Sequence, residues 1–214
     1  HKNFSDLLTH PYDTQGLHEI EKRLHIAGVA NSNPSMNFFL TDHEKKHIIK
    51  PKKPNAPFVI GIHPGAKDRF KQWAPKNFIE LGRILFYRKN AYIFITGSAY
   101  ESSLCNHIAS YIPFAHCLAG KLSVRQLAAQ INTFNLLITN DTGPMHIGYA
   151  LNIPTFAPFS PTNPSLCGPY HSHHGSYIYR EKTCAPCTGK KCKTPFCLEQ
   201  ISPSMVYDKI THYL

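Results

Sequence analysis

The sequence has no long apolar segment and few acidic side chains. No apolar run approaches the roughly 20 residues that a membrane-spanning helix requires, and no signal-peptide pattern is present. We therefore expect neither a membrane-embedded nor a secreted protein. Charged residues make up only 17% of the 214 residues and hydrophobic residues 42%, a balance typical of a chain that folds around a core.

Three common catalytic signatures are also absent. The sequence contains no Walker A motif, no G-x-S-x-G elbow and no G-x-G-x-x-G fingerprint. Their absence weakens the hypotheses of an ATPase, an α/β-hydrolase and a NAD-dependent dehydrogenase, and no cofactor is expected. The length fits one large domain or two small ones, and a start at His1 indicates a processed chain or part of a longer one.

Positive charge is what the sequence has in excess. Lys and Arg outnumber Asp and Glu by 23 to 13, which gives a net charge of +10. This charge favours anionic partners such as phosphates, nucleic acid or an acidic lipid surface. The same charge also keeps a protein in solution, so the count alone does not choose among these roles.

The seven cysteines are an odd number, which argues against a fully paired secreted framework. Four of them form a Cys-rich segment, residues 184–197, with the spacing C-x2-C-x4-C-x4-C: Cys184, Cys187, Cys192 and Cys197. Four thiolates could bind zinc tetrahedrally, form disulfides in air or stay free. The spacing is neither that of a zinc ribbon nor that of a bacterial ferredoxin, so no metal site is assigned.

The chain divides into two regions. Residues 1–55 show one short helical pattern, Leu17–Ile26, and lead into the proline- and lysine-rich stretch Lys50–Pro57, which is typical of a linker. We expect residues 1–55 to be a remnant of, or connection from, a preceding N-terminal domain. Residues 56–214 are predicted to form one domain that ends in a helix over 203–213.

Short apolar segments alternate with amphipathic segments in this second region. The expected strands cover residues 58–62, 91–95, 115–118, 136–139 and 154–158, and the expected helices cover residues 75–88, 102–111, 123–133 and 144–151. Strands that are apolar on both faces need helices on both sides of the sheet. The pattern therefore predicts an α/β fold with a doubly wound, Rossmann-like parallel sheet.

Three loops follow predicted strands and precede predicted helices: residues 63–67, 96–101 and 140–144. Parallel sheets bind ligands outside the carboxyl ends of their strands, so we expect the three loops to lie at one edge of the sheet. Each loop alone could be an ordinary turn between a strand and a helix.

The segment 140–146 is the most informative of these. A side chain at Asp141 or Thr142 could cap the helix that follows. The free amides near Thr142, Gly143 and Met145 would then lie at the positive end of the helix dipole, where they attract a phosphate or pyrophosphate.

Other side chains could complete such a site, and each has an alternative interpretation. Lys67, Arg69 and Lys71 form either a solvated basic loop or a phosphate clamp. Glu101 could accept hydrogen bonds from ribose hydroxyls, or it could be an ordinary carboxylate in a first helical turn. His146 could hydrogen-bond the anion or be a packed core histidine.

Several motifs occur in a fixed order: His63-Pro-Gly-Ala, Lys71-Gln-Trp-Ala-Pro75, Leu118-Ala-Gly120, Asn140-Asp-Thr-Gly-Pro-Met-His146, and Phe159-Ser-Pro-Thr-Asn-Pro164 with Cys167-Gly-Pro169. From about Phe58 to its end, the chain resembles the carboxyl-terminal half of a family 9 glycosyltransferase, the ADP-heptose:lipopolysaccharide heptosyltransferases. The Cys-rich segment followed by Ile201-Ser-Pro-Ser-Met-Val206 is most similar to the heptosyltransferase II branch.

The resemblance implies a GT-B architecture whose second half binds ADP-heptose or a related nucleotide sugar. The donor-binding residues expected on this basis are His63, Gly65, Lys71, Ser98, Glu101, Asp141, Thr142, Gly143 and His146. Of these, Lys71 would contact the diphosphate and Glu101 the adenosine ribose, while the last four would surround the pyrophosphate and the sugar.

The resemblance also implies the reaction and its place. Heptose would be transferred to a lipopolysaccharide core acceptor in the cytoplasm. The basic charge is compatible with peripheral docking at the inner membrane, where an anionic membrane surface would present the acceptor, although the sequence shows no obvious amphipathic anchor. The expected general base, an acidic residue, belongs to the amino-terminal half that this chain does not match. We therefore expect the chain alone to be inactive; the sequence does not fix the sugar, the acceptor or the oligomeric state.

Two departures from the family pattern leave alternatives open. One residue separates Trp73 from Pro75, where many members have none, and the gap between Cys192 and Cys197 is short and lacks a histidine. The rival hypothesis is a non-catalytic, basic Cys-rich module that binds nucleic acid or other acidic ligands. Within the cluster only Phe196 could stack on a base, so nucleic acid is not the expected partner.

Overall fold

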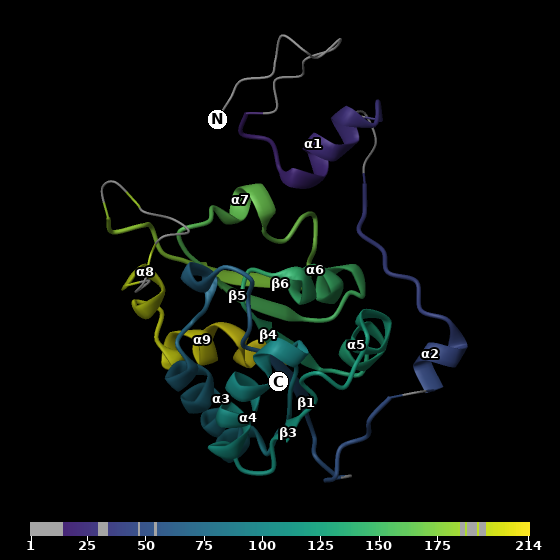
Figure 1. Cartoon of the computed structure of the whole chain (residues 1–214), viewed down its shortest axis with the longest axis vertical. Coiled ribbons are helices and arrows are strands. Elements are labelled where there is room, and N and C mark those ends of the chain that lie inside the picture. Colours follow the sequence, from purple (N-terminus) through teal and green to yellow (C-terminus); the bar gives the residue numbers. More distant parts are fainter. Residues whose placement is uncertain are drawn as a thin grey trace.

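The computed structural model describes residues 15–29, 34–46, 48–53, 55–184, 187, 192 and 196–214. Its centre is a six-stranded sheet in the order β3-β2-β1-β4-β5-β6, in which neighbouring strands are parallel (Figure 1). The strands are β1 (Val59–His63), β2 (Tyr92–Ile95), β3 (His116–Cys117), β4 (Leu136–Thr139), β5 (Thr155–Phe159) and β6 (Gly175–Tyr179). The predicted doubly wound parallel sheet is confirmed, and β6 is an addition to the predicted strands.

The helices of the second region also match the prediction to within a few residues. The helices are α1 (Glu19–Ile26), α2 (Asp42–Lys46), α3 (Pro75–Lys89), α4 (Ser102–Ser110), α5 (Val124–Ile131), α6 (Gly143–Ala150), α7 (Pro164–Cys167), α8 (Phe196–Glu199) and α9 (Pro203–Ile210). Three short 3-10 helices are η2 (Arg69–Lys71), η3 (Ala99–Glu101) and η5 (Thr211–Tyr213). The sequence pattern did not predict α2, α7 or α8.

The helices cover both faces of the sheet because alternate strand residues point to opposite sides. Ile60 and Ile62 of β1 are fully buried in a cluster with Leu81 of α3. Phe94 of β2 instead packs with Ile131 of α5 on the opposite face. In Figure 1, α3, α4 and α9 lie on one side of the sheet and α5 and α6 on the other.

The strand order places a topological switch point between β1 and β4. The chain runs outward from β1 to β2 and β3, and then returns to β4 on the other side of β1. Ile62 is paired both with Ile95 of β2 and with Ile138 of β4, so the carboxyl ends of these three strands lie side by side. Doubly wound sheets bind ligands in the crevice at such a point.

The amino-terminal region contains no strand among its described residues. The predicted helix over 17–26 is confirmed as α1, and the described residues of 50–57 form no helix or strand, as expected of a linker. α1 lies against α7, and the chain then runs along the molecule to α2 beside α5 before it reaches β1 (Figure 1). No helix among the described residues is both long and apolar enough to cross a membrane.

Candidate functional site

Asn140 holds two loops together at the switch point. Its side chain is fully buried directly after β4. The Nδ2 atom donates to the Pro64 carbonyl at 2.7 Å, and Oδ1 accepts from the Trp73 amide at 3.0 Å. Asn140 therefore fixes the loop after β1 against the turn after β4. It lies outside the expected donor-binding set, although its position directly after a buried strand was a usable signal.

An ion pair lies beside Asn140. Lys71 Nζ is 2.6 Å from Asp141 Oδ2, and the two side chains are 21% and 6% exposed, respectively. A carboxylate this buried needs a charged partner because desolvation penalises an isolated charge. The structure thus brings together Lys71 and Asp141, which the sequence places 70 residues apart.

The turn at the start of α6 offers free amides. Thr142 is the N-cap residue, but its side chain makes no capping hydrogen bond, and the Met145 amide donates to the Thr142 carbonyl at 3.1 Å. The expectations of a side-chain cap and of a free amide at Met145 are therefore wrong, because the Asp141 carboxylate pairs with Lys71 and the first turn closes on itself. Within the described residues, the amides of Thr142 and Gly143 have no partner, and the space beside the Gly143 α-carbon is open.

The loops after β1, β2 and β4 meet at Gly65. Oε2 of Glu101 accepts hydrogen bonds from the Ser98 amide at 2.7 Å and the Ser98 hydroxyl at 2.8 Å. A Cβ atom on Gly65 would lie 1.8 Å from Glu101 Oε1, and Asn140 Nδ2 lies 3.3 Å from the Gly65 carbonyl. Only a residue without a side chain allows the Glu101 carboxylate to approach the backbone this closely.

His63 supports the site from inside the protein. Its side chain is 6% exposed, and Nδ1 lies 3.0 Å from Thr96 Oγ1. Burial lowers the pKa of His63 to about 4, and the nearby Glu101 carboxylate opposes this shift. The imidazole is therefore neutral at pH 7 and joins the ends of β1 and β2.

His146 lies in the first turn of α6, close to the ion pair. Burial lowers the pKa of His146, Asp141 opposes this shift, and His18 and Lys71 add to it. Its ring packs edge-on against Tyr149 with the centroids 6.2 Å apart. A neutral imidazole at this place can donate or accept one hydrogen bond without adding charge.

Polar groups outside the expected set also lie at this edge. Among the described residues, the buried hydroxyls of Ser160 and Thr162, directly after β5, have no hydrogen-bond partner, and neither does the Tyr149 hydroxyl. Buried polar groups without a partner are rare in folded proteins and often mark a place where a ligand or water binds. The sequence signal for the first two was the motif Phe159–Pro164.

Cys167 lies beside the ion pair but is not a nucleophile. Its Sγ atom is 4.0 Å from Asp141 Oδ2, and burial, with Asp141 nearby, raises the pKa of the Cys167 thiol to about 11. The thiol is therefore protonated at pH 7. The arrangement of one ammonium group, two free amides and a neutral imidazole is suited to binding an anion and stabilising its charge.

The single tryptophan packs its loop onto α3. The Trp73 ring lies edge-on to Phe78 of this helix, with the ring centroids 5.0 Å apart. Its Nε1 also donates to the Ile201 carbonyl at 2.9 Å, so Trp73 ties the carboxyl-terminal segment to the loop that carries Lys71.

The Cys-rich segment is only partly described. Residues 185–186, 188–191 and 193–195 lie outside the described residues, whereas Cys184, Cys187 and Cys197 are present as free thiols. In the described part, no three His, Cys, Asp or Glu side chains are grouped as metal ligands would be. Zinc binding, disulfide formation and free thiols therefore stay alternative predictions for this segment.

Comparisons with known proteins identify the family. The family model described as "Glycosyltransferase family 9 (heptosyltransferase)" matches residues 12–197. Lipooligosaccharide heptosyltransferase 2 of Campylobacter jejuni is 29% identical over 163 residues, which cover 73% of this chain and 51% of that protein.

Solved structures show the same fold. Escherichia coli ADP-heptose lps heptosyltransferase II aligns with a TM-score of 0.73 at 22% identity, covering 92% of this chain and 62% of that one. A family 9 glycosyl transferase from Veillonella parvula aligns with a TM-score of 0.77 at 21% identity, covering 100% and 65%. Both alignments cover most of this chain, so the expected fold is confirmed.

The chain spans about half the length of the curated relatives it matches. The family model nevertheless covers most of this chain, including the turn at Asp141 and the loop that carries Lys71. The chain belongs to glycosyltransferase family 9, the heptosyltransferases.

Proposed function

We propose that this chain is the donor-binding half of a heptosyltransferase that takes heptose from ADP-heptose and transfers it to a lipopolysaccharide core acceptor. The observation that carries this proposal is the position of Lys71, 2.6 Å from Asp141 at the start of α6. Two unpartnered amides lie in the same turn. The family and the name of the Escherichia coli relative support the choice of donor and acceptor.

The diphosphate would bind by replacing one partner of the ion pair. Its oxygens compete with Asp141 for Lys71 and accept hydrogen bonds from the amides of Thr142 and Gly143, at the positive end of α6. Asp141, released from Lys71, then accepts hydrogen bonds from sugar hydroxyls, and the neutral His146 supplies one more.

The adenosine ribose would lie near Glu101. Oε2 of this carboxylate is held by Ser98, whereas Oε1 makes no hydrogen bond within the described residues. A carboxylate oxygen of this kind can accept hydrogen bonds from the two ribose hydroxyls. Because Gly65 lets Glu101 approach the loop after β1, ribose and diphosphate would bind on neighbouring loops.

In the reaction, the bond between the anomeric carbon and the diphosphate oxygen breaks while the acceptor hydroxyl attacks that carbon. The charge that develops on ADP is stabilised by Lys71 and the two amides. The acceptor proton passes to an acidic base that we assign to the amino-terminal half, with residues 1–55 as the connection to it. On this proposal, the chain alone binds the donor and does not transfer the sugar.

Calorimetry with ADP tests the assignment. We expect Lys71→Ala to weaken ADP binding about 10- to 100-fold, the usual range for a charged hydrogen bond. Lys209→Ala, an exposed lysine of α9, is the control for loss of one charge and should leave binding unchanged.

Lys71→Ala also leaves Asp141 unpaired, so Lys71→Gln and a circular dichroism spectrum check that the fold is intact. The proposal is contradicted if the wild-type chain does not bind ADP. It is also contradicted if a folded Lys71 variant binds ADP with the affinity of the wild type. Salt-sensitive RNA binding by a chain indifferent to ADP would instead favour the acidic-ligand module.

A further inference from the structure

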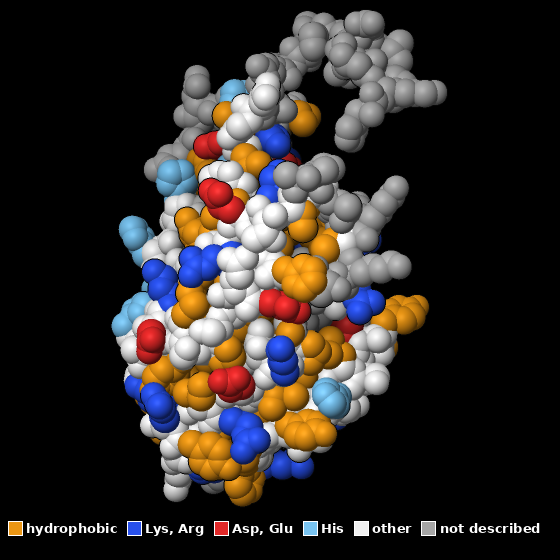
Figure 2. Space-filling view, turned by 90° about the vertical axis from the view of Figure 1, so that its left-hand side faces the viewer, with side chains coloured by type: hydrophobic (Ala, Val, Ile, Leu, Met, Phe, Trp, Pro, Cys, Tyr) orange, Lys and Arg blue, Asp and Glu red, His pale blue; other side chains and the backbone are white. Residues whose placement is uncertain are grey.

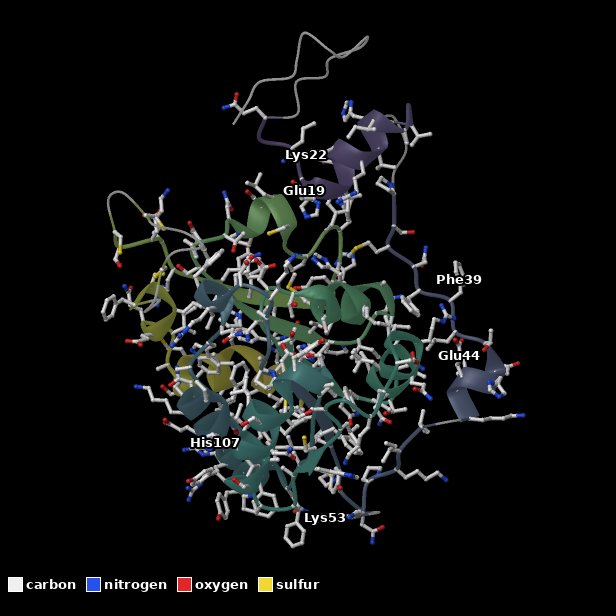
Figure 3. All side chains as sticks on the ribbon, in the orientation of Figure 1. Glu19, Lys22, Phe39, Glu44, Lys53 and His107 are labelled. Atoms are coloured by element: carbon white, nitrogen blue, oxygen red, sulfur yellow. The ribbon has the colours of Figure 1, made fainter. Side chains whose placement is uncertain are left out.

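A hollow lies at the β3 edge of the sheet. It has a volume of about 510 Å³ and is lined by residues of the linker, α4 and β3, including Lys52, Asn106, His116 and Lys121. None of its lining residues belongs to the donor site. We call this area the β3-edge surface: residues 48–53, 83–90 and 106–121, at the lower end of the molecule, where Lys53 and His107 are labelled (Figure 3).

The charges of the β3-edge surface have one sign. The sequence has no Asp or Glu in residues 48–53, 83–90 and 106–121, the three stretches that build it. Their basic residues are Lys50, Lys52, Lys53, Arg83, Arg88, Lys89 and Lys121; of these, Arg83 and Arg88 line a separate hollow that also contains Glu80. Figure 2 shows Lys and Arg side chains beside hydrophobic side chains at this lower end.

The hollow also contains a polar atom without a partner. The His116 Nδ1 is buried and accepts or donates no hydrogen bond among the described residues. Burial lowers the pKa of His116, and the nearby Lys121 and Lys52 lower it further. Both ammonium groups therefore act on this hollow without an acidic side chain to neutralise them.

Exposed aromatic rings also belong to the β3-edge surface, and one of them, Phe114, lines the hollow with Lys52 and Lys121. Tyr87, Tyr111 and Phe114 are 66%, 56% and 70% exposed. Phe114 has a φ of 57°, a left-handed conformation that is strained for a bulky residue, and its ring stacks on Phe86 at 5.9 Å. Lys53 Nζ lies 5.4 Å from the centre of the Phe86 ring, so rings and cations share one surface.

We propose that the β3-edge surface docks on an anionic phospholipid bilayer, with a lipid phosphate in the hollow between Lys52 and Lys121. A bilayer interface takes up both parts of this surface, because cations bind the acidic headgroups and aromatic rings insert at headgroup depth. A soluble phosphate would account for the lysines alone. The exposed, strained Phe114 is the ring placed to enter the headgroup region.

Co-sedimentation with vesicles tests the proposal without reference to ADP binding. We expect the full chain to bind vesicles of phosphatidylcholine with about one third phosphatidylglycerol, and not pure phosphatidylcholine. Each lysine near an anionic surface changes binding about fivefold, so Lys52→Ala/Lys121→Ala should weaken it on the order of 25-fold. Phe114→Ser should weaken it about fivefold.

Matched controls remove the same groups elsewhere. Arg23→Ala/Lys46→Ala removes two exposed charges from α1 and α2, and Phe39→Ser removes a ring that is 83% exposed beside α2. Both should bind as the wild type does, and all variants should melt within a few degrees of it. Equal binding to neutral and anionic vesicles, or equal losses in the controls, overturns the proposal. The proposal is also overturned if the chain binds glycerol 3-phosphate but does not bind vesicles. That result would assign the hollow to a soluble organic phosphate.

Discussion

At the scale of single residues, Gly65 determines whether three loops can share one edge. Its carbonyl faces Asn140, and its α-carbon faces Glu101 so closely that a Cβ would lie 1.8 Å from Oε1. The end of the Glu101 side chain can move away, but it then loses its hydrogen bonds to Ser98. A methyl group at position 65 therefore changes the position of the Glu101 carboxylate more than it changes the stability of the fold.

We expect Gly65→Ala to lower the free energy of unfolding by only about 1 kcal/mol, the usual cost of a lost cap. On the proposed function, ADP binding should weaken about tenfold, the value of one hydrogen bond to a charged group. Inorganic pyrophosphate should bind as before, because it has no ribose. Calorimetry with both ligands and urea unfolding measure these effects.

Gly143→Ala is the control for stability, since a Cβ there meets no atom within 4 Å. Equal losses of ADP and pyrophosphate binding in Gly65→Ala would show that the methyl group distorts the whole loop. An unchanged ADP affinity would remove Glu101 from the site. A Glu101→Gln variant combined with Gly65→Ala should add little, because both changes act on the same carboxylate.

At the scale of elements, Arg125 of α5 attaches the amino-terminal region to the domain. Its Nη2 donates to Glu44 Oε2 and to the Phe39 carbonyl, each at 2.7 Å, and its guanidinium lies 4.9 Å from the centre of the Phe38 ring. Glu44 and Phe39 are labelled at the edge of the molecule in Figure 3. The helix α2 has no buried residue of its own, so its position depends on contacts of this kind.

We expect Arg125→Ala to release α2 while the sheet stays intact. The amide of Phe38, which donates to the Ala150 carbonyl at 3.2 Å, should exchange its hydrogen about threefold faster, as for the loss of one exposed ion pair. The change is read by hydrogen exchange. Val124→Ala, on the same exposed turn of α5, should leave this rate unchanged; an equal increase in both variants would mean that α5 itself frays.

Periodicity predicted those elements whose own residues determine them. β4 occupies the predicted residues 136–139 because its first three side chains are apolar and all four residues are buried. α5 begins within the predicted helix 123–133, at a capping box in which the Ser123 hydroxyl accepts from the Gln126 amide. α2 has the sequence DHEKK, which has no apolar face, and β6 has an exposed residue at its centre, so neither gave a clear signal.

The candidate site could likewise be predicted only in part from the sequence. Gly, Pro and charged residues after buried strands indicated which loops would meet, because parallel strands end at one edge. The ion pair of Lys71 with Asp141 and the hydrogen bonds of Asn140 join residues that are far apart in the sequence. These contacts depend on how the loops fold across the switch point, which the sequence pattern does not show. The ring position of His63, buried beside Thr96, likewise follows from packing.

At the scale of the whole molecule, the carboxyl-terminal residues complete the core that supports the site. Val206 and Ile210 of α9 are fully buried in the cluster that contains Leu81 of α3. Trp73 joins this cluster to the loop of Lys71 through its hydrogen bond to the Ile201 carbonyl. The proposed domain, residues 56–214, therefore has one continuous core on this face of the sheet.

The only tryptophan of the chain makes this continuity measurable. Trp73 is 1% exposed in the folded protein, so unfolding should shift its fluorescence to longer wavelength. If residues 56–214 unfold as one cooperative unit, the urea transition of this signal should coincide with the transition of helix content measured by circular dichroism. The variant Trp73→Phe is the control that shows which part of the fluorescence comes from Trp73. Because this change leaves the Ile201 carbonyl without its donor, it should lower the free energy of unfolding by about 1–3 kcal/mol. Two separated transitions would show that the carboxyl-terminal segment unfolds apart from the sheet, and the single-domain assignment would then be wrong.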